Sequence, residues 1–194
     1  MKNKPLILAS SSPRRLDLLK QAGIIPDQIL PANLDETPLK NEKPRALALR
    51  LSVAKASAIP PSPSSFVLAA DTVVGCGLRI LPKTETEEEA RACLALLSGR
   101  RHRVYGGIAI RTPEGKMLSR VTMAVVEMKR LSSLEINAYI ASGEWQGKAG
   151  GYAIQGLAAT FIPSIRGTYS GVVGLSVYDT IQMLTGSGFF ISES

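Results

Sequence analysis

The chain has 194 residues, of which 45% are hydrophobic and 20% charged, a composition that excludes a disordered or fibrous protein and predicts one domain over residues 1–194. No apolar run reaches the roughly 18 residues that span a bilayer, and the N-terminal apolar run is too short for a signal peptide, so we expect a cytoplasmic protein with no membrane partner. The net charge of +7 favours phosphates, nucleotides or nucleic acid as partners, or serves solubility alone.

The N-terminal part of the chain predicts a strand–loop–helix unit, then a second helix and a second strand. Ser12 fits the N-cap of the first helix, Pro13 its first position, and Gly23 the position just past its end. Asp71 and Thr72 directly follow the second apolar run and are expected at the carboxyl end of that strand. The predicted elements are strands at 6–9 and 66–70, helices at 14–22 and 46–58, and a surface loop at 60–65.

The rest of the chain alternates helices and strands. Thr86 with Glu89 and Ser132 with Glu135 form capping-box patterns, which predict the starts of two helices. The further predicted elements are a hairpin of strands at 104–111 and 117–128 with a turn at 112–115, a strand at 158–165, a loop at 167–174, and a helix at 175–184 with Val177, Tyr178, Ile181 and Leu184 on one face. Helices mixed with strands and an antiparallel hairpin predict an α/β protein on a mixed sheet.

The chain has few residues that bind soft metals. Cys76 and Cys93 lie in apolar stretches without CxxC spacing, and we expect both to be reduced core thiols. His102 is the single histidine, and its three arginine neighbours predict a surface position without a ligand role. A histidine-based metal site is therefore excluded. Any metal should have oxygen ligands, which favours Mg²⁺ or Mn²⁺ over Zn²⁺.

Residues 10–15, Ser-Ser-Ser-Pro-Arg-Arg, form the first candidate site. A loop that enters a helix presents free N–H groups and the positive end of the helix dipole, and both attract phosphate. The Ser10 hydroxyl and the guanidiniums of Arg14 and Arg15 add further donors. The loop lacks the Walker A pattern. A capped helix with two solvated arginines is the structural alternative.

Other candidates are scattered along the chain. Asp71 could hold a metal or activate water, or it could simply turn the chain. Lys55 and Lys83 could each neutralise a phosphate, although most such lysines are only solvated. Gln155, in the glycine-rich segment 148–156, could read the polar edge of a base, or the segment could be a plain turn. Asp35 and Glu36 fit a solvated loop.

Six segments, in their order and spacing, resemble the Maf family over nearly the whole chain. They are 10–15, Lys55, 70–74 (Ala-Asp-Thr-Val-Val), 97–100 (Leu-Ser-Gly-Arg), 148–156 and 169–175. The resemblance implies a mixed twisted sheet with flanking helices and a deep central cleft, similar to the inosine triphosphatase-like (Ham1) fold. It also implies a hydrolase that uses Mg²⁺ or Mn²⁺ to cleave a nucleoside triphosphate into the monophosphate and pyrophosphate, often as a homodimer.

The resemblance assigns roles to single positions. Asp71 matches the catalytic proton acceptor, and Asp71 with Glu36 would hold the metal. Positions linked to base choice are Arg14, Thr72 and Gln155, and positions lining the phosphate site are Ser10, Arg14, Arg15, Lys55 and Lys83. The form Lys-Ala-Gly-x-Tyr-x-Ile-Gln-Gly at 148–156 resembles the branch that acts on dTTP and UTP, whereas the branch that acts on 7-methyl-GTP has Phe-Lys and Glu-Gly there.

Several positions depart from the family pattern, and they bear on metal stoichiometry and efficiency. They are Ser11 for Gly, Asn33 for Asp, Pro82 and Thr84 for Gly and Pro, Thr86 for Asp, Gly106 for Thr, and Gly171 for Asn. Two alternatives stay open: a pyrophosphatase for a modified purine nucleotide such as 7-methyl-GTP, and a non-catalytic nucleotide- or nucleic-acid-binding regulator of cell division. The departures and the charge favour the regulator, but aromatic residues make up only 5% of the chain and form no stacking series for nucleic acid.

Overall fold

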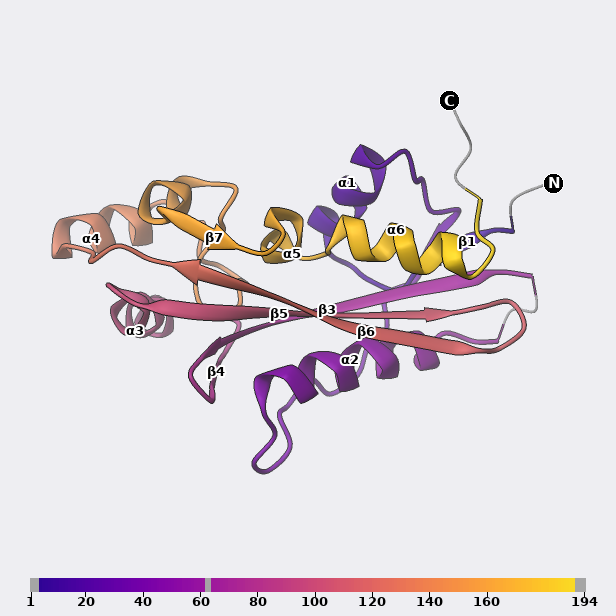
Figure 1. Cartoon of the computed structure of the whole chain (residues 1–194). Coiled ribbons are helices and arrows are strands. Elements are labelled where there is room, and N and C mark those ends of the chain that lie inside the picture. Colours follow the sequence, from indigo (N-terminus) through magenta and orange to yellow (C-terminus); the bar gives the residue numbers. More distant parts are fainter. Residues whose placement is uncertain (1–3, 62–63, 191–194) are drawn as a thin grey trace.

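A computed structural model describes residues 4–61 and 64–190 and shows one twisted sheet with helices on both faces (Figure 1). In chain order the elements are β1 (Leu6–Leu8), α1 (Pro13–Gln21), β2 (Gln28–Ile29), α2 (Pro44–Ala58), β3 (Phe66–Cys76), β4 (Arg79–Leu81), α3 (Glu87–Leu97), β5 (Arg101–Arg111), β6 (Met117–Glu127), α4 (Ser133–Ala141), the 3₁₀ helix η1 (Leu157–Phe161), β7 (Ser164–Arg166), α5 (Tyr169–Val173) and α6 (Val177–Gly186).

The sheet has seven strands in the order β2-β1-β3-β5-β6-β7, and β4 pairs with the end of β3. β1 is parallel to β2 and β3, whereas β3, β5, β6 and β7 pair with one another in antiparallel fashion. The predicted mixed α/β fold is therefore confirmed. The helix α2 covers one face of the long strands, and α1, α5 and α6 lie on the other (Figure 1). In the described ranges, none of the helices has the length and hydropathy to cross a bilayer.

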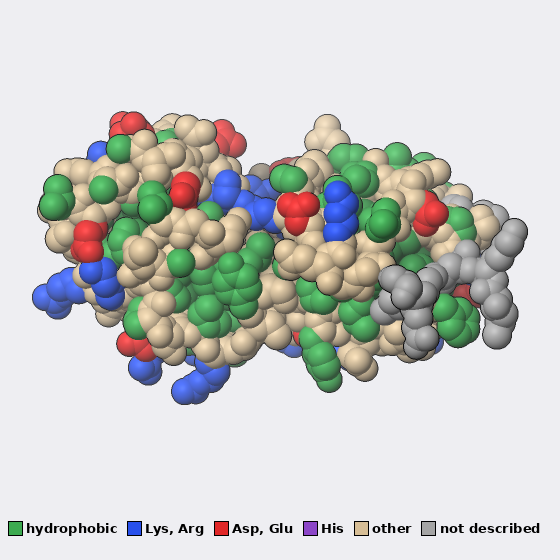
Figure 2. Space-filling view, turned by 90° about the horizontal axis from the view of Figure 1, so that it is seen from above, with side chains coloured by type: hydrophobic (Ala, Val, Ile, Leu, Met, Phe, Trp, Pro, Cys, Tyr) green, Lys and Arg blue, Asp and Glu red, His purple; other side chains and the backbone are tan. Residues whose placement is uncertain are grey.

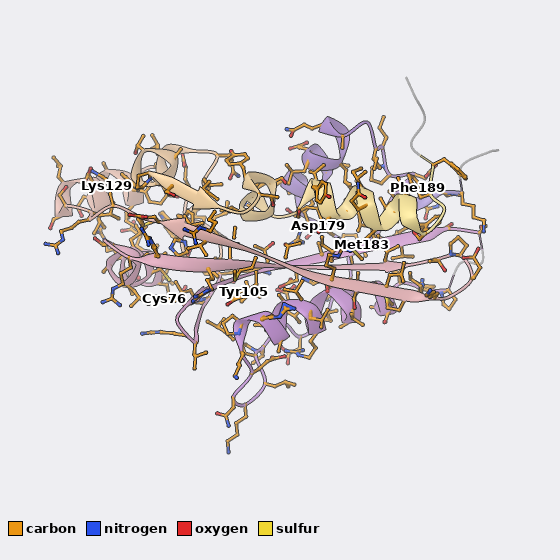
Figure 3. The ribbon with its side chains drawn as sticks, viewed as in Figure 1. Cys76, Tyr105, Lys129, Asp179, Met183 and Phe189 are labelled. Atoms are coloured by element: carbon orange, nitrogen blue, oxygen red, sulfur yellow. The ribbon has the colours of Figure 1, made fainter. Side chains whose placement is uncertain are left out.

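Two large apolar clusters lie toward opposite ends of the long strands. One contains Leu94, Val126 and Trp145 and joins α3 and α4 to the sheet. The other joins α1, β1 and α6, and its members include Met183 of α6 and Phe189 just after it, both labelled in Figure 3. On β3, Ala70 belongs to the second cluster and Val74 to the first. Asp71 and Thr72 lie between these two residues, so the strand places both polar side chains where the two apolar clusters meet.

Local sequence signals explain the starts of α3 and α4. Both predicted capping boxes are present: Thr86 accepts the Glu89 N–H at 3.3 Å, and Ser132 accepts the Glu135 N–H at 3.3 Å. The predicted hairpin between β5 and β6 is confirmed along its full length. Cys76 and Cys93 are free thiols, as predicted, although Cys76 is only half-buried.

Two predictions about strands were wrong, and two short strands were missed. Asp71 does not end its strand, because β3 continues to Cys76 and stays in register with β5 through Gly75. The predicted strand at 158–165 is mostly η1, whose first turn closes with the Ala159 N–H on the carbonyl of Gly156, and only its end belongs to β7. The short strands β2 and β4 were not predicted, because they are too brief to show alternation.

Two smaller predictions near the C-terminus also failed. The segment 167–174 is not a plain loop, since it contains α5, which begins where the Thr168 hydroxyl accepts the Gly171 N–H. Tyr178 does not lie on the apolar face of α6, because 66% of its surface is exposed while Met183 and Leu184 are buried. The apolar face of α6 is therefore shifted around the helix relative to the prediction.

A single glycine lets α2 lie unusually close to the sheet. A Cβ atom on Gly107 in β5 would come within 1.9 Å of the Ala48 carbonyl oxygen and 2.8 Å of the Ser52 hydroxyl. Because the first of these atoms is backbone, no side-chain movement could relieve the overlap. The glycine therefore sets the distance at which α2 presents its side chains to β3.

We expect Gly107→Ala to lower the free energy of unfolding by about 3 kcal/mol, because α2 would have to move away from the sheet. Gly186→Ala is the matched control: it adds the same methyl group to a helix position where nothing lies within 4 Å. That variant should be neutral or stabilising by up to about 1 kcal/mol. Urea denaturation of both variants measures the difference, and equal stability of the two would contradict this account of the helix–sheet contact.

Candidate active site

A cavity of about 390 Å³ opens where the two apolar clusters meet. Figure 2 shows basic side chains in the hollow between the two halves of the molecule. The walls come from the loop after β1, the start of α1, the segment before α2, α2 itself, the middle of β3, β5, the segment after β4, the glycine-rich loop and the end of α5. All the predicted site residues line it: Ser10, Arg14, Arg15, Glu36, Lys55, Asp71, Thr72, Lys83 and Gln155.

Lys55 is the centre of a chain of ion pairs on the α2 side of the sheet. Its Nζ lies 2.5 Å from Oδ1 of Asp71 and 2.6 Å from Oε1 of Glu36, and the other oxygen of Glu36 pairs with Lys83. The side chains of Lys55 and Asp71 are only 8% and 5% exposed. A buried ammonium is unfavourable without partners, so Lys55 is not one of the solvated lysines.

Glu36 also differs from its expected position on a solvated loop. Burial raises the pKa of its carboxyl, but hydrogen bonds from Lys55 and Lys83 outweigh this effect and hold the pKa below its ordinary value. Asp35, its neighbour, points elsewhere: its side chain is exposed and accepts the Thr37 N–H at 2.8 Å. Of the two adjacent acids, only Glu36 lines the cavity.

Arg15 connects three parts of the chain on the opposite face of β3. Its Nε donates to the Gly174 carbonyl at 3.0 Å, and its two terminal nitrogens donate to Ser10 at 3.0 Å and to Thr72 at 3.2 Å. The Thr72 hydroxyl also donates to Gly174 at 3.2 Å. No pattern in the sequence pointed to this carbonyl, because its role depends on a contact between residues near the two ends of the chain.

Other cations in the cavity are short of anionic partners. The Nε of Arg14 is buried and has no hydrogen-bond partner among the described residues. Burial lowers the pKa of the Lys148 ammonium, and the positive charge of Arg14 lowers it further. An anionic ligand would provide the acceptor that Arg14 lacks and offset the repulsion between these two cations.

A buried contact between His102 of β5 and Tyr152 anchors the glycine-rich loop to the sheet. His102 lies 2.7 Å from the Tyr152 hydroxyl, and it is only 2% exposed. The predicted surface position of His102 was therefore wrong: the strand β5 alternates, so His102 and Val104 face inward while Arg101 and Arg103 face solvent. Gln155, three residues after the tyrosine, is exposed in the cavity wall.

Some departures from the family pattern have structural roles here. The Thr84 hydroxyl donates to the Trp145 carbonyl at 2.7 Å, which links the segment carrying Lys83 to the residues just before the glycine-rich loop. Two backbone hydrogen bonds strengthen this connection, from Gly147 to Thr84 at 2.8 Å and from Gly150 to Pro82 at 2.9 Å. Lys83 is thereby placed on the cavity rim although its segment is short.

The carboxylates suit a hard cation. Asp71 and Glu36 both pair with the ammonium of Lys55, so oxygens of the two carboxylates lie close to each other. Groups of three or more His, Cys, Asp or Glu side chains placed to hold a metal are not found in the described residues. Mg²⁺ in proteins is usually held by one or two carboxylates, with substrate phosphates and water completing its shell, so Asp71 and Glu36 are the residues that could hold such an ion.

The fold and the cavity define an α/β protein whose central cavity is lined by several cations and two carboxylates. The family model described as Maf-like protein matches residues 5–187. The dTTP/UTP pyrophosphatase of Mesorhizobium japonicum is 57% identical over 97% of this chain and 94% of that protein, and the one from Paramagnetospirillum magneticum is 60% identical over 95% and 97%. A HAM1 protein from Coxiella burnetii is similar in structure, with 14% identity, coverage of 94% and 98%, and a TM-score of 0.48. The chain belongs to the Maf-like protein family.

His102 predicts a pH dependence of stability. Burial lowers its pKa from 6.5 to about 4, so in the folded protein the ring stays neutral where the unfolded chain takes up a proton. The neutral histidine therefore makes its whole contribution to the free energy of unfolding above pH 6.5. This contribution is lost as the pH drops from 6.5 to about 4, by about 3 kcal/mol in total. We expect His102→Gln, which keeps a polar group but does not titrate, to lose this component.

The difference in unfolding free energy between wild type and His102→Gln, measured in urea from pH 7.5 to 4, isolates the histidine from the carboxylates that titrate in the same range. A difference that narrows as the pH falls is the expected result. A constant difference would show that the histidine titrates alike in both states.

Proposed function

We propose that this protein is a metal-dependent pyrophosphatase that cleaves dTTP and UTP into the nucleoside monophosphate and pyrophosphate. The observation that carries the proposal is the buried Lys55–Asp71 pair on one wall of a cavity otherwise rich in cations. Relatives that share more than half of their residues with this chain bear the name dTTP/UTP pyrophosphatase.

The triphosphate would lie along the basic part of the cavity. Arg14, with an unpaired buried Nε, and Lys148 are the cations with capacity for phosphate oxygens. Lys83 is exposed at the rim and can turn from Glu36 toward a phosphate. Arg15 also belongs to the phosphate site in this proposal, where it would act mainly by holding Ser10 and Thr72 in place.

Asp71 is the proton acceptor in the proposed reaction. It takes a proton from a water molecule whose oxygen attacks the α-phosphorus, the bond from this phosphorus to the bridging oxygen breaks, and pyrophosphate leaves. Lys55 fixes one oxygen of the carboxylate at 2.5 Å. Asp71 and Glu36 are the residues that would hold Mg²⁺ or Mn²⁺, and the bound ion supplies neutralisation of the phosphate charges.

Base choice would depend on the wall opposite the phosphates. Gln155 offers an amide that can both donate and accept, which matches the edge of uracil or thymine. Thr72 is already bonded to Arg15 and Gly174, so it would set the shape of this wall as much as contact the base. The cavity volume suits a single nucleotide.

The experiment is release of pyrophosphate from dTTP, UTP, CTP, GTP and 7-methyl-GTP, with Mg²⁺, Mn²⁺ or EDTA. We expect cleavage of dTTP and UTP at least about tenfold more efficiently than of the other substrates, and none in EDTA. Efficient cleavage of 7-methyl-GTP instead would support the purine alternative. Salt-sensitive binding of random DNA without any cleavage would overturn the proposal and support a binding protein.

A further inference from the structure

A carboxylate outside the cavity wall contacts the end of the loop that carries Gln155. Glu144 follows α4, and its Oε2 accepts the Leu157 N–H at 2.8 Å, at the start of η1. Its own N–H donates to Ser142 at 3.2 Å, which fixes the backbone from which the side chain extends. Glu144 thus bonds to the residue two positions after Gln155 although it is not part of the cavity wall.

The contact between this carboxylate and the loop is very close. A Cβ atom on Gly156 would lie 2.0 Å from Oε2 and 2.9 Å from Oε1 of Glu144, so the carboxylate occupies the space that any other residue would need there. The Gly156 N–H in turn donates to the Ala153 carbonyl at 3.1 Å, which closes a tight turn around Gln155. The backbone around Gln155 is therefore held by the turn from Ala153 to Gly156 and by the hydrogen bond from Leu157 to Glu144.

We propose that Glu144 is a positioning residue for base selection: through Leu157 and Gly156 it fixes the turn that presents the Gln155 amide to the base. The inference rests on the proposed function and adds to it a residue that contacts neither substrate nor metal. The contacts of Arg15 and Lys55 at the phosphate end of the cavity do not involve Glu144, whose charge acts there only on Lys148. Loss of Glu144 should therefore weaken recognition of the base while leaving the chemical step intact.

The test compares steady-state constants for dTTP and GTP in wild type, Glu144→Ala and Glu144→Gln. We expect Glu144→Ala to raise KM for dTTP about tenfold with little change in kcat, the size of effect expected from loss of one hydrogen bond to a charged group, and to leave the constants for GTP unchanged. Glu144→Gln keeps an acceptor for the Leu157 N–H and should restore most of the selectivity. Glu114→Ala, an exposed glutamate in the β5–β6 turn, is the control.

Gly156→Ala separates a positioning role from general damage to the fold. In the wild-type background the added methyl group displaces the carboxylate, so the same loss of selectivity is expected. In the Glu144→Ala background that space is free, so Gly156→Ala should add little. Losses that simply multiply in the double variant would overturn the inference, as would an unchanged dTTP-to-GTP ratio in Glu144→Ala.

The wild-type result distinguishes failure of the proposed function from failure of this inference. A wild type that cleaves neither nucleotide, or cleaves both equally well, overturns the proposed function and this inference with it. A selective wild type whose selectivity survives in Glu144→Ala overturns the inference alone.

Discussion

The buried ammonium of Lys55 is the constraint on which the rest of the site depends. Removal of an ion from water costs on the order of several kcal/mol even after relaxation, so Lys55 can be buried only where acids surround it. One acid comes from the middle of β3 and the other from the segment before α2. Close packing of α2 at Gly107 brings the ammonium within reach of both. Fold and site are therefore fixed by the same contact.

The pleat of β3 distributes the site over both faces of the sheet. Successive side chains point to opposite faces, so Asp71 meets α2 while Thr72 meets Arg15 and Gly174 on the other side. One strand thus connects the acidic part of the cavity to the part that is rich in donors. Because the two apolar clusters end on either side of this pair, the polar residues gather where the hydrophobic core is interrupted.

Features encoded by neighbouring residues could be predicted from the sequence. Both capping boxes and the long hairpin depend on residues a few positions apart, and all are present. The strand was wrongly predicted to end before Asp71, because a charged residue after an apolar run usually marks a strand end. Only the pairing of Asp71 with Lys55 of α2 makes a central position in the strand favourable. His102 was misplaced because its arginine neighbours hid the alternation of β5.

The family resemblance supplied what local patterns could not. Lys55 and Glu36 have ordinary surroundings in the sequence, and nothing in their spacing, 19 residues apart, predicts a contact at 2.6 Å. The Gly174 carbonyl and the Glu144 carboxylate had no signal at all, since both act through contacts between distant segments. Such groups become visible only when the chain is folded.

Release of pyrophosphate from dTTP by Asp71→Asn tests the central claim most directly, with Asp35→Asn as the control because that carboxylate is exposed and bonds only to its own loop. The account predicts that Asp71→Asn remains folded and loses at least about 100-fold in kcat, the contribution expected of a positioned general base, while Asp35→Asn keeps full activity. Full activity in Asp71→Asn would contradict the assignment of the buried carboxylate as the centre of the reaction.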